Sequence, residues 1–510
     1  MSWQKLPQEI RLQILEEIAA RDGHRNLPRL ARVCREWQYF FEGRLYKHVV
    51  LDQNILRTFE STVTTNRTKL AAVEAVIFRI KLPEYQFPQC LLNNIAFTDQ
   101  VIELLGMLSR WHLIKKKGIS LGLAVFSPSD NEHRFFFCEE EEDYPFRFEG
   151  DLQRSPNLLE YYDRNIWKST RHICPSEEHY DQANKREEKA RVCGYPLSLD
   201  DGDPEFTIVP DLPSVPIVEH FFIRRQGFRI IGVYAVTHIV LMSLTNLTSF
   251  RYERRAGLDP LAESHHRDKQ AEGLIPNLPR SIRQLSLTRW TSFHSILDRW
   301  QSGSMLRTAG IVNVFQHLTD FATNCTGTAD HILAEMTIPG MCQSLERLSL
   351  SPQSFNGGTY YICQHPTALM DTIEQASEIL PACPNLRVME LWGVSQDIGH
   401  IFRYKMDREA RRASITWSTS HLDVPSLRRT VVKSWVDAMA NILEHPLAIR
   451  TERINETELA MQISRGQTLL KHLELRHLLM HPLTLAEINA EEELKRVRGL
   501  RRIPRSNLEQ

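Results

Sequence analysis

The stretch LPQEIRLQILEEIAA, residues 6–20, predicts a helix with more apolar surface than one packing face needs. Pro7 suits a first helical position, and the acidic Glu9 lies near the positive end of the helix dipole. The apolar residues cover an arc of roughly 200°, about twice the stripe of an ordinary surface helix. They fall on two lines, Ile10, Ile14 and Ile18 on one and Leu12, Leu15 and Ala19 on the other. The sequence therefore predicts two packing partners for this helix.

A second helical period follows after the turn-rich segment RDGHRN, residues 21–26. Asn26 and Pro28 are typical helix start signals, and the apolar residues beyond them recur at helical spacing. These residues are Leu30, Val33, Cys34, Trp37, Phe40 and Phe41. We therefore expect residues 1–47 to form a compact N-terminal helical module.

Short strand-like runs of the form apolar-x-x-apolar-x-apolar recur beyond residue 48. The runs are LTSFRY (247–252), IRQLSL (282–287), LERLSL (345–350), LRVMEL (386–391) and LKHLEL (470–475), with weaker copies VEAVIF (73–78) and VEHFFI (218–223). Helix-like stretches lie between them, at 365–383 and 434–446. Strand, turn and helix in alternation are typical of a leucine-rich-repeat solenoid, although the runs are more widely and unevenly spaced than repeats of about 20–29 residues. The predicted fold class is α/β, with an irregular repeat-like body over residues 48–490; a plain mixed α/β domain is the alternative.

Several charged or polar stretches predict loops. Two polar insertions are expected at residues 138–151 and 174–191, and an arginine-rich loop at 404–414. The segment 491–510 predicts a frayed helix followed by a disordered charged tail.

The composition favours a soluble intracellular protein with protein partners. Of 510 residues, 42% are hydrophobic, and the net charge of −1 gives no basic field for nucleic acid or an anionic membrane. The most apolar run, residues 230–244, is too short to cross a bilayer, and the charged N-terminus predicts no signal peptide. Nine cysteines without a CxxC pair favour reduced thiols in the cytoplasm or the nucleus.

The N-terminal motifs resemble the F-box. The resemblance rests on LPQEI (6–10), the paired apolar positions of the first helix, the Val-Cys-x-x-Trp of residues 33–37 and the segment LYKHV (45–49). It implies a three-helix module that docks on a Skp-type adaptor, which connects the module to a cullin ubiquitin ligase. The adaptor-facing set carried over by position is Leu6, Pro7, Ile10, Ile14, Leu15, Val33 and Trp37. The alternative is that these side chains pack on residues 48 onward of the same chain.

The rest of the chain resembles a fungal family of F-box proteins with an uncharacterised C-terminal region. The likeness is carried by FRIKLPEY (78–85), SPSDNEHRF (127–135), VEHFFIRRQ (218–226) and NLRVMELWGV (385–394). Together the two resemblances predict a substrate receptor of a cullin-type ligase, which captures a target protein with its body and is not itself a catalyst. An F-box scaffold without ligase activity is a second hypothesis.

Catalytic, metal and cofactor chemistry is weakly indicated. Ser127, Asp130 and His133 are close in sequence, but a hydrolase triad must converge in space, and no G-x-S-x-G is present. Zinc-compatible residue types occur without a standard spacing at His172, Cys174, His179 and Cys193. No phosphate-binding glycine loop occurs, and the arginines of FIRRQGFRI (222–230) favour a solvent-facing turn over RNA binding. We expect no catalytic residue, metal or cofactor.

Overall fold

The computed structural model describes thirteen stretches of the chain. These are residues 3–84, 90–127, 196–199, 210–224, 230–256, 274–291, 314–324, 326–355, 366–395, 398–421, 426–440, 442–454 and 469–485. The chain divides into two compact units: the first comprises Met1–Asp181, Leu197–Ile231 and Met242–Asn246, and the second the remaining residues, chiefly Leu247–Gln510. The loops predicted at 138–151 and 174–191 and the tail predicted at 491–510 lie outside the described residues.

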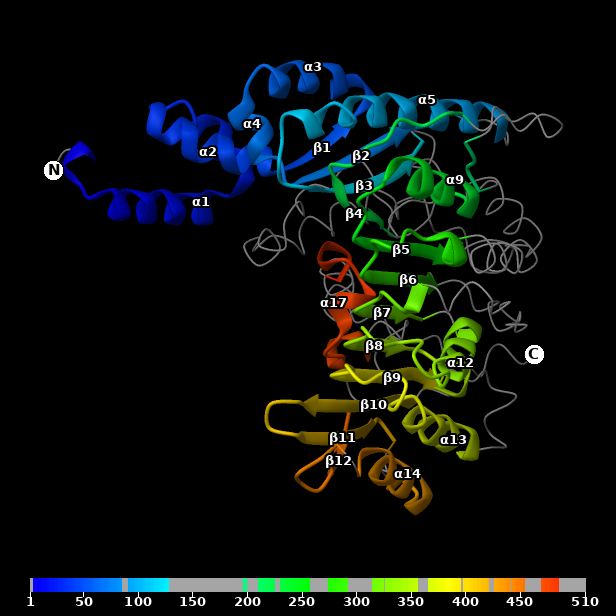
Figure 1. Cartoon of the computed structure of the whole chain (residues 1–510). Helices are drawn as coiled ribbons and strands as arrows, with labels where there is room; N and C mark the ends of the chain where they lie inside the picture. Colours follow the sequence, from blue (N-terminus) through cyan, green and yellow to red (C-terminus); the bar gives the residue numbers. More distant parts are fainter. Residues whose placement is uncertain are drawn as a thin grey trace, which may run out of the picture. The chain divides into compact units, whose positions relative to one another are not determined.

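The N-terminal module has two long helices, not the three predicted. Its elements are η1 (Trp3–Lys5), α1 (Gln8–Leu30) and α2 (Arg35–Lys47) (Figure 1). The expected connector at 21–26 is part of α1, and the chain turns between Ala31 and Cys34, where Cys34 is extended. The prediction was wrong because the apolar spacing continues across this turn, and a spacing pattern alone does not show where the backbone bends.

The first unit continues into parallel strands covered by helices. Its further elements are β1 (His48–Asp52), α3 (Gln53–Thr64), α4 (Arg67–Ala72), β2 (Ala75–Lys81), α5 (Cys90–Leu108), η2 (Trp111–Leu113), β3 (Ile119–Phe126) and β4 (Val218–Ile223). Strands β1 to β4 are neighbours in chain order and run parallel. Side chains fix where α3 and α4 begin, because Asp52 and Asn66 each accept hydrogen bonds from two backbone N–H groups of the following turn. The strand-like runs at 73–78 and 218–223 are confirmed as β2 and β4.

The second unit alternates strands and helices. Its elements are α9 (Val233–His238), β5 (Ser249–Ala256), η7 (Ile275–Asn277), β6 (Gln284–Thr291), β7 (Asp320–Thr323), α12 (Thr326–Glu335), β8 (Arg347–Leu350), η9 (Gln353–Phe355), α13 (Pro366–Ser377), β9 (Val388–Ser395), β10 (Ile398–Asp407), β11 (Arg412–Thr419), α14 (Arg429–Met439), β12 (Ala448–Arg453), η10 (Leu470–His472) and α17 (Arg476–Leu479). A π-helical turn, η5 (Ile239–Ser243), follows α9. None of the described helices is long and apolar enough to span a membrane.

The strands β5 to β9 are parallel and follow chain order, whereas β9, β10 and β11 are antiparallel and β12 is parallel to β11. Four predicted strand runs are confirmed as β5, β6, β8 and β9. The arginine-rich loop predicted at 404–414 is wrong, because these residues form the facing ends of β10 and β11 and the turn between them. Only that turn, closed by Arg411 at a φ of 45°, keeps a loop conformation. The mixed α/β class is confirmed, and the repeat-like solenoid stays a prediction.

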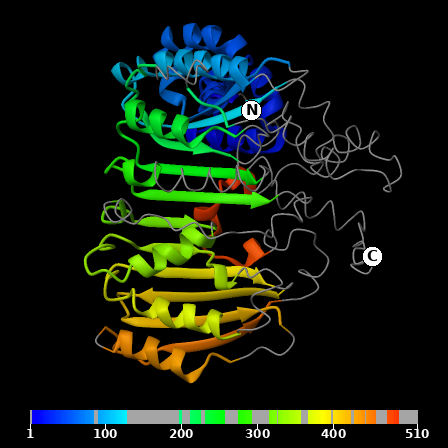
Figure 2. The same ribbon diagram turned by 90° about the vertical axis from the view of Figure 1, so that its right-hand side faces the viewer.

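Alternation along the strands gives the second unit's sheet two different faces. One face is apolar and lies on the side of α12, α13 and α14 (Figures 1 and 2). Its buried residues include Phe250, Tyr252, Leu285, Leu287, Phe321, Leu348, Leu350, Met389 and Leu391. The other face lies on the side of α17 and carries the charged and hydroxyl residues. The run LKHLEL at 470–475 is not the strand that we expected: its first three residues form the 3₁₀ turn η10 on this second face, and a turn follows.

Candidate functional site

The N-terminal module has its own small core. Leu15 and Phe41 are fully buried there, together with Ala19 and Leu27, and Trp37 packs against them. The ring centroid of Trp37 lies 5.7 Å from that of Trp3 and 5.6 Å from that of Phe41. This aromatic contact holds the N-terminal turn η1 against α2.

A shared carboxylate fixes the same corner. Glu36 accepts a hydrogen bond of 2.8 Å from the indole Nε1 of Trp3 and another of 2.8 Å from the guanidinium of Arg11. η1, α1 and α2 are therefore joined at one point, which orients the start of α1.

Large apolar side chains remain exposed on this module. Their exposed fractions are 42% for Ile10, 40% for Leu12, 60% for Val33 and 73% for Tyr39. We call these four residues the exposed apolar set. Ile10 and Leu12 are two positions apart on α1 and therefore point to different sides of the helix, so a single second packing face stays a prediction.

The structure separates the seven predicted adaptor-facing residues. Pro7, Ile10 and Val33 are exposed, whereas Leu6, Ile14 and Trp37 are half-buried. Leu15 is fully buried in the core of the module, so it supports the fold and is not on its surface.

Sequence reasoning left out two exposed apolar residues, Leu12 and Tyr39. Leu12 lies on the same predicted line of α1 as Leu15 and Ala19. Leu15 and Ala19 are buried, whereas Leu12, the first residue of the line, is exposed. Tyr39 lies two positions after Trp37 on α2, so the helical spacing itself places it on another side of that helix.

The side of α2 that faces away from Trp37 and Phe41, which also carries Tyr39, is covered at its C-terminal end by α4. Lys69 of α4 lies with its Nζ 3.4 Å from the carboxylate of Glu42 and 5.1 Å from the ring centroid of Tyr46. Tyr46 in turn contacts the ring of Phe59 on α3. The alternative stated above, that the apolar side chains of this module pack on residues 48 onward, therefore holds for this part of α2. It does not hold for Ile10 and Val33, which are exposed.

The residues considered for hydrolysis and metal binding do not form a described site. Ser127 is 2% exposed, and its hydroxyl donates a hydrogen bond of 2.8 Å to the carbonyl oxygen of Pro83. Asp130 and His133 lie outside the described residues, as do His172, Cys174, His179 and Cys193. Within the described stretches, no three His, Cys, Asp or Glu side chains are grouped as metal ligands would be.

A second feature, which the sequence did not predict, lies on the polar face of the second unit. Residues 469–485, which we call the C-terminal strap, cover buried carboxylates there. Glu390 is fully buried and accepts hydrogen bonds from Nε of Arg403 at 2.6 Å and from the backbone N–H groups of Glu474 and Leu475 at 3.0 and 2.8 Å. Main-chain groups of the strap thus neutralise part of a buried charge.

A second buried carboxylate binds the other end of the strap. Glu253 is 1% exposed and accepts hydrogen bonds from the backbone N–H of His481 and, at 2.7 Å, from the hydroxyl of Thr484. The two glutamates lie on β9 and β5, so the strap crosses the intervening strands.

Sheet side chains between the two glutamates donate to carbonyl oxygens of the strap. Arg251 donates to His477 at 2.8 Å and Ser286 to Leu479 at 2.9 Å. Arg403, which pairs with Glu390, also donates to His472 at 2.6 Å. Burial lowers the pKa of His477, and the charge of Arg347 lowers that pKa further.

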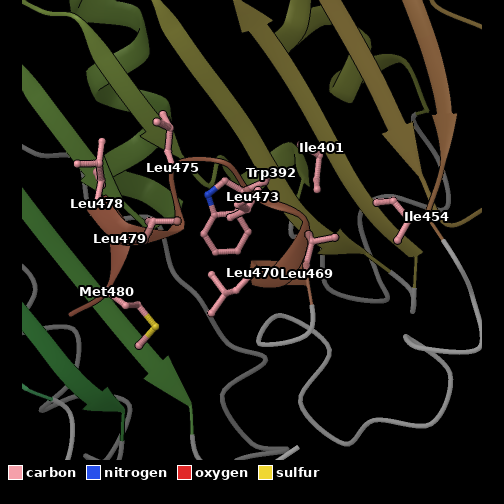
Figure 3. Packing of buried hydrophobic residues seen from close by; sticks show 11 residues of the cluster. Trp392, Ile401, Ile454, Leu469, Leu470, Leu473, Leu475, Leu478, Leu479 and Met480 are labelled. Carbon is pink, nitrogen blue, oxygen red and sulfur yellow. The ribbon is translucent and has the colours of Figure 1, made fainter. Parts of the chain in front are cut away.

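The strap also buries a row of apolar side chains on this face (Figure 3). Trp392 lies at the centre of the cluster, between strap leucines, with Ile401 and Ile454 beside it. The strap residues of the cluster are Leu469, Leu470, Leu473, Leu475, Leu478, Leu479 and Met480. The strap is therefore held by main-chain hydrogen bonds and by regularly spaced apolar side chains.

Comparison with known proteins identifies two regions. A family model described as F-box-like matches residues 3–52, and a model described as a family of unknown function, DUF6546, matches residues 277–481. Neither the curated proteins nor the solved structures contained a match. The chain thus has an F-box-like domain formed by η1, α1, α2 and β1, and a DUF6546 region that runs from the lead into β6 to the strap.

Proposed function

We propose that this protein is the substrate-receptor subunit of a cullin-type ubiquitin ligase. Its F-box-like domain would dock on a Skp-type adaptor, and its α/β body would bind the target protein. The observation that carries the proposal is the match at residues 3–52, supported by apolar side chains that this domain leaves exposed, Ile10 and Val33 above all.

The magnitudes are compatible with such an interface. Burying one large apolar side chain contributes about 1.5–3 kcal/mol, whereas association costs about 4–15 kcal/mol before any net affinity results. Burial of the four side chains of the exposed apolar set would offset only the lower part of this range of association costs. Half-buried Leu6, Ile14 and Trp37 would add contact area at its edge.

The receptor itself would catalyse no bond change. It would hold a target near a conjugating enzyme supplied by other subunits, which raises the effective concentration of a target lysine. This role places the protein inside the cell, in the cytoplasm or the nucleus. A fungal origin and a leucine-rich-repeat-like body belong to the same proposal, the latter supported by the parallel order of β5 to β9.

The interface is tested by a double substitution, Ile10→Asp with Val33→Asp. Both side chains are exposed, so the fold is retained while two carboxylates would have to be buried against the adaptor. We expect recovery of a co-expressed Skp-type adaptor in a pull-down to fall at least tenfold. Leu113→Asp is the matched control, because Leu113 is 78% exposed and lies outside the F-box-like domain. Wild-type recovery with the double variant would refute this interface.

A second measurement separates the receptor from an F-box scaffold without ligase activity. The wild-type chain is purified from cells in which cullin neddylation and the proteasome are inhibited. A receptor recovers the adaptor and a cullin together, whereas recovery of the adaptor without any cullin would identify the scaffold.

A further inference from the structure

The face that the strap covers combines a row of polar side chains with an apolar patch. The register places Arg251, Ser286, Ser349 and Glu390 in one row across β5, β6, β8 and β9. Charged and hydroxyl groups in such a row are readily hydrated. Beside this row the face carries an apolar patch, which contains Trp392, Ile401 and Ile454, with Val388 and Val394 packed against it.

The sheet contacts the strap mainly through the strap's main chain. Carboxylates accept from N–H groups at 474, 475 and 481, and donors on three strands bond to the carbonyl oxygens of 472, 477 and 479. Every peptide has these groups, so the polar contacts do not require the strap's own sequence. Lys471 and Arg476 of the strap are exposed.

The sequence-dependent part of the contact between strap and sheet is therefore the spacing of the buried leucines. The strap sequence LLKHLELRHLLM (469–480) buries its seven apolar residues in the pattern L-L-x-x-L-x-L-x-x-L-L-M. Its helical elements have only three and four residues. Helical elements this short are not stable alone, so contacts with the sheet stabilise the conformation of the strap.

We propose that the polar face of β5–β10 is a peptide-binding site that the C-terminal strap occupies in the free protein. Its ligand class is a target segment with the strap's leucine spacing, which replaces the strap by exchange. Identification of this ligand as the ubiquitination target rests on the proposed function above, whereas the exchange itself does not.

The test uses the full chain with a sequence-specific protease site placed at residues 461–466, outside the described stretches. After cleavage only non-covalent contacts retain the strap. A fluorescent synthetic peptide of residues 469–485 is expected to bind the cleaved chain saturably and the uncleaved chain at least tenfold more weakly. A peptide with Leu473, Leu475, Leu478 and Leu479 replaced by Ser is expected not to bind.

The carboxylate contact is tested in the same assay. Glu390→Gln, introduced into the cleaved chain, removes the charge that Arg403 and two strap N–H groups share, and is expected to weaken peptide binding at least tenfold. Glu346→Gln is the matched control, because this glutamate is half-buried and pairs with Arg387 instead. Equal affinity in both variants would refute the role of Glu390.

A second measurement needs neither cleavage nor substitution. Hydrogen exchange of the intact chain is followed with and without excess peptide, and the backbone amides of Glu474, Leu475 and His481 are expected to exchange faster when the peptide is present. Unchanged exchange of these amides, together with no peptide binding to the cleaved chain, would overturn the proposal. Neither assay contains an adaptor or a cullin, so its failure is distinct from failure of the F-box interface.

Discussion

Two ionisable side chains of the second unit show how burial without a close opposite charge shifts a pKa. Asp330 accepts a hydrogen bond of 2.8 Å from the backbone N–H of Gln353, and burial raises its pKa to about 6. His400 stacks on Trp417 with ring centroids 5.5 Å apart, and burial, with a smaller effect from His421, lowers its pKa to about 4. The two groups therefore make opposite contributions to the pH dependence of stability.

Asp330→Asn is expected to stabilise the protein at pH 7.5. A folded pKa of about 6, against the ordinary aspartate value of 3.8, means that the folded state prefers the protonated carboxyl. The stability that this group contributes is present below pH 3.8 and is lost as the pH rises through 6, at a cost of up to about 3 kcal/mol. Urea unfolding should show a gain of about 1–3 kcal/mol at pH 7.5 that disappears near pH 4. A loss of stability at pH 7.5 would contradict the assignment.

His400→Gln is expected to flatten the acid side of the stability profile. Because the folded pKa of about 4 lies below the ordinary histidine value of 6.5, stability is lost as the pH falls from 6.5 towards 4, by at most about 3 kcal/mol. Unfolding free energies at pH 7.5 and 4.5 measure this difference, and the substitution should reduce it. His445→Gln, at an exposed histidine, is the control. If the unfolding free energy of His400→Gln changes with pH as much as that of the wild type, this would be evidence against a buried neutral imidazole.

At the scale of elements, α14 is joined to its neighbours by one buried tryptophan. The indole Nε1 of Trp435 donates a hydrogen bond of 3.0 Å to the carbonyl oxygen of Ile373 on α13. Its ring also contacts Phe402 and Tyr404 of β10, with centroid separations of 5.0 and 5.3 Å. Helix α14 is thereby positioned against both a helix and a strand.

Trp435→Phe tests this contact. The smaller ring keeps most of the apolar area but leaves the carbonyl of Ile373 without its indole donor, which should cost about 1–3 kcal/mol. Trp435→Ala should cost about 3–5 kcal/mol because it adds a cavity. Chemical denaturation measures both, and Val436→Ala, at an exposed position of the same helix, should stay within about 0.5 kcal/mol of the wild type. Equal losses of stability on substitution of Trp435 and Val436 would show that Trp435 does not position α14.

Local patterns predicted most strands of the fold and missed what depends on distant contacts. The apolar-x-x-apolar-x-apolar runs located β5, β6, β8 and β9, because alternation on a half-buried strand is a property of the segment itself. The same pattern failed at 470–475, where distant residues such as Trp392 bury the leucines in a turn. Glu253 and Glu390 occupy positions that alternation assigns to solvent, and only the strap, far along the chain, buries them.

At the scale of the whole molecule, the candidate site was predictable where it depends on sequence motifs. The wide apolar arc of α1 predicted a second packing partner, which stays a prediction, and Ile10 and Leu12 of that arc are exposed. The sequence could not separate Leu15 from these residues. All of them satisfy the same helical spacing. Which of them are buried depends on where α2 packs against α1 after the turn at 31–34.

The most direct test of the central claim is a calorimetric titration of the full chain with a purified Skp-type adaptor. The F-box assignment predicts saturable one-to-one binding with a Kd of about 1 µM or lower, equivalent to about −8 kcal/mol, and a loss of that binding in the Ile10→Asp, Val33→Asp variant. Absence of binding by the wild-type chain, or unchanged affinity of the variant, would contradict the account.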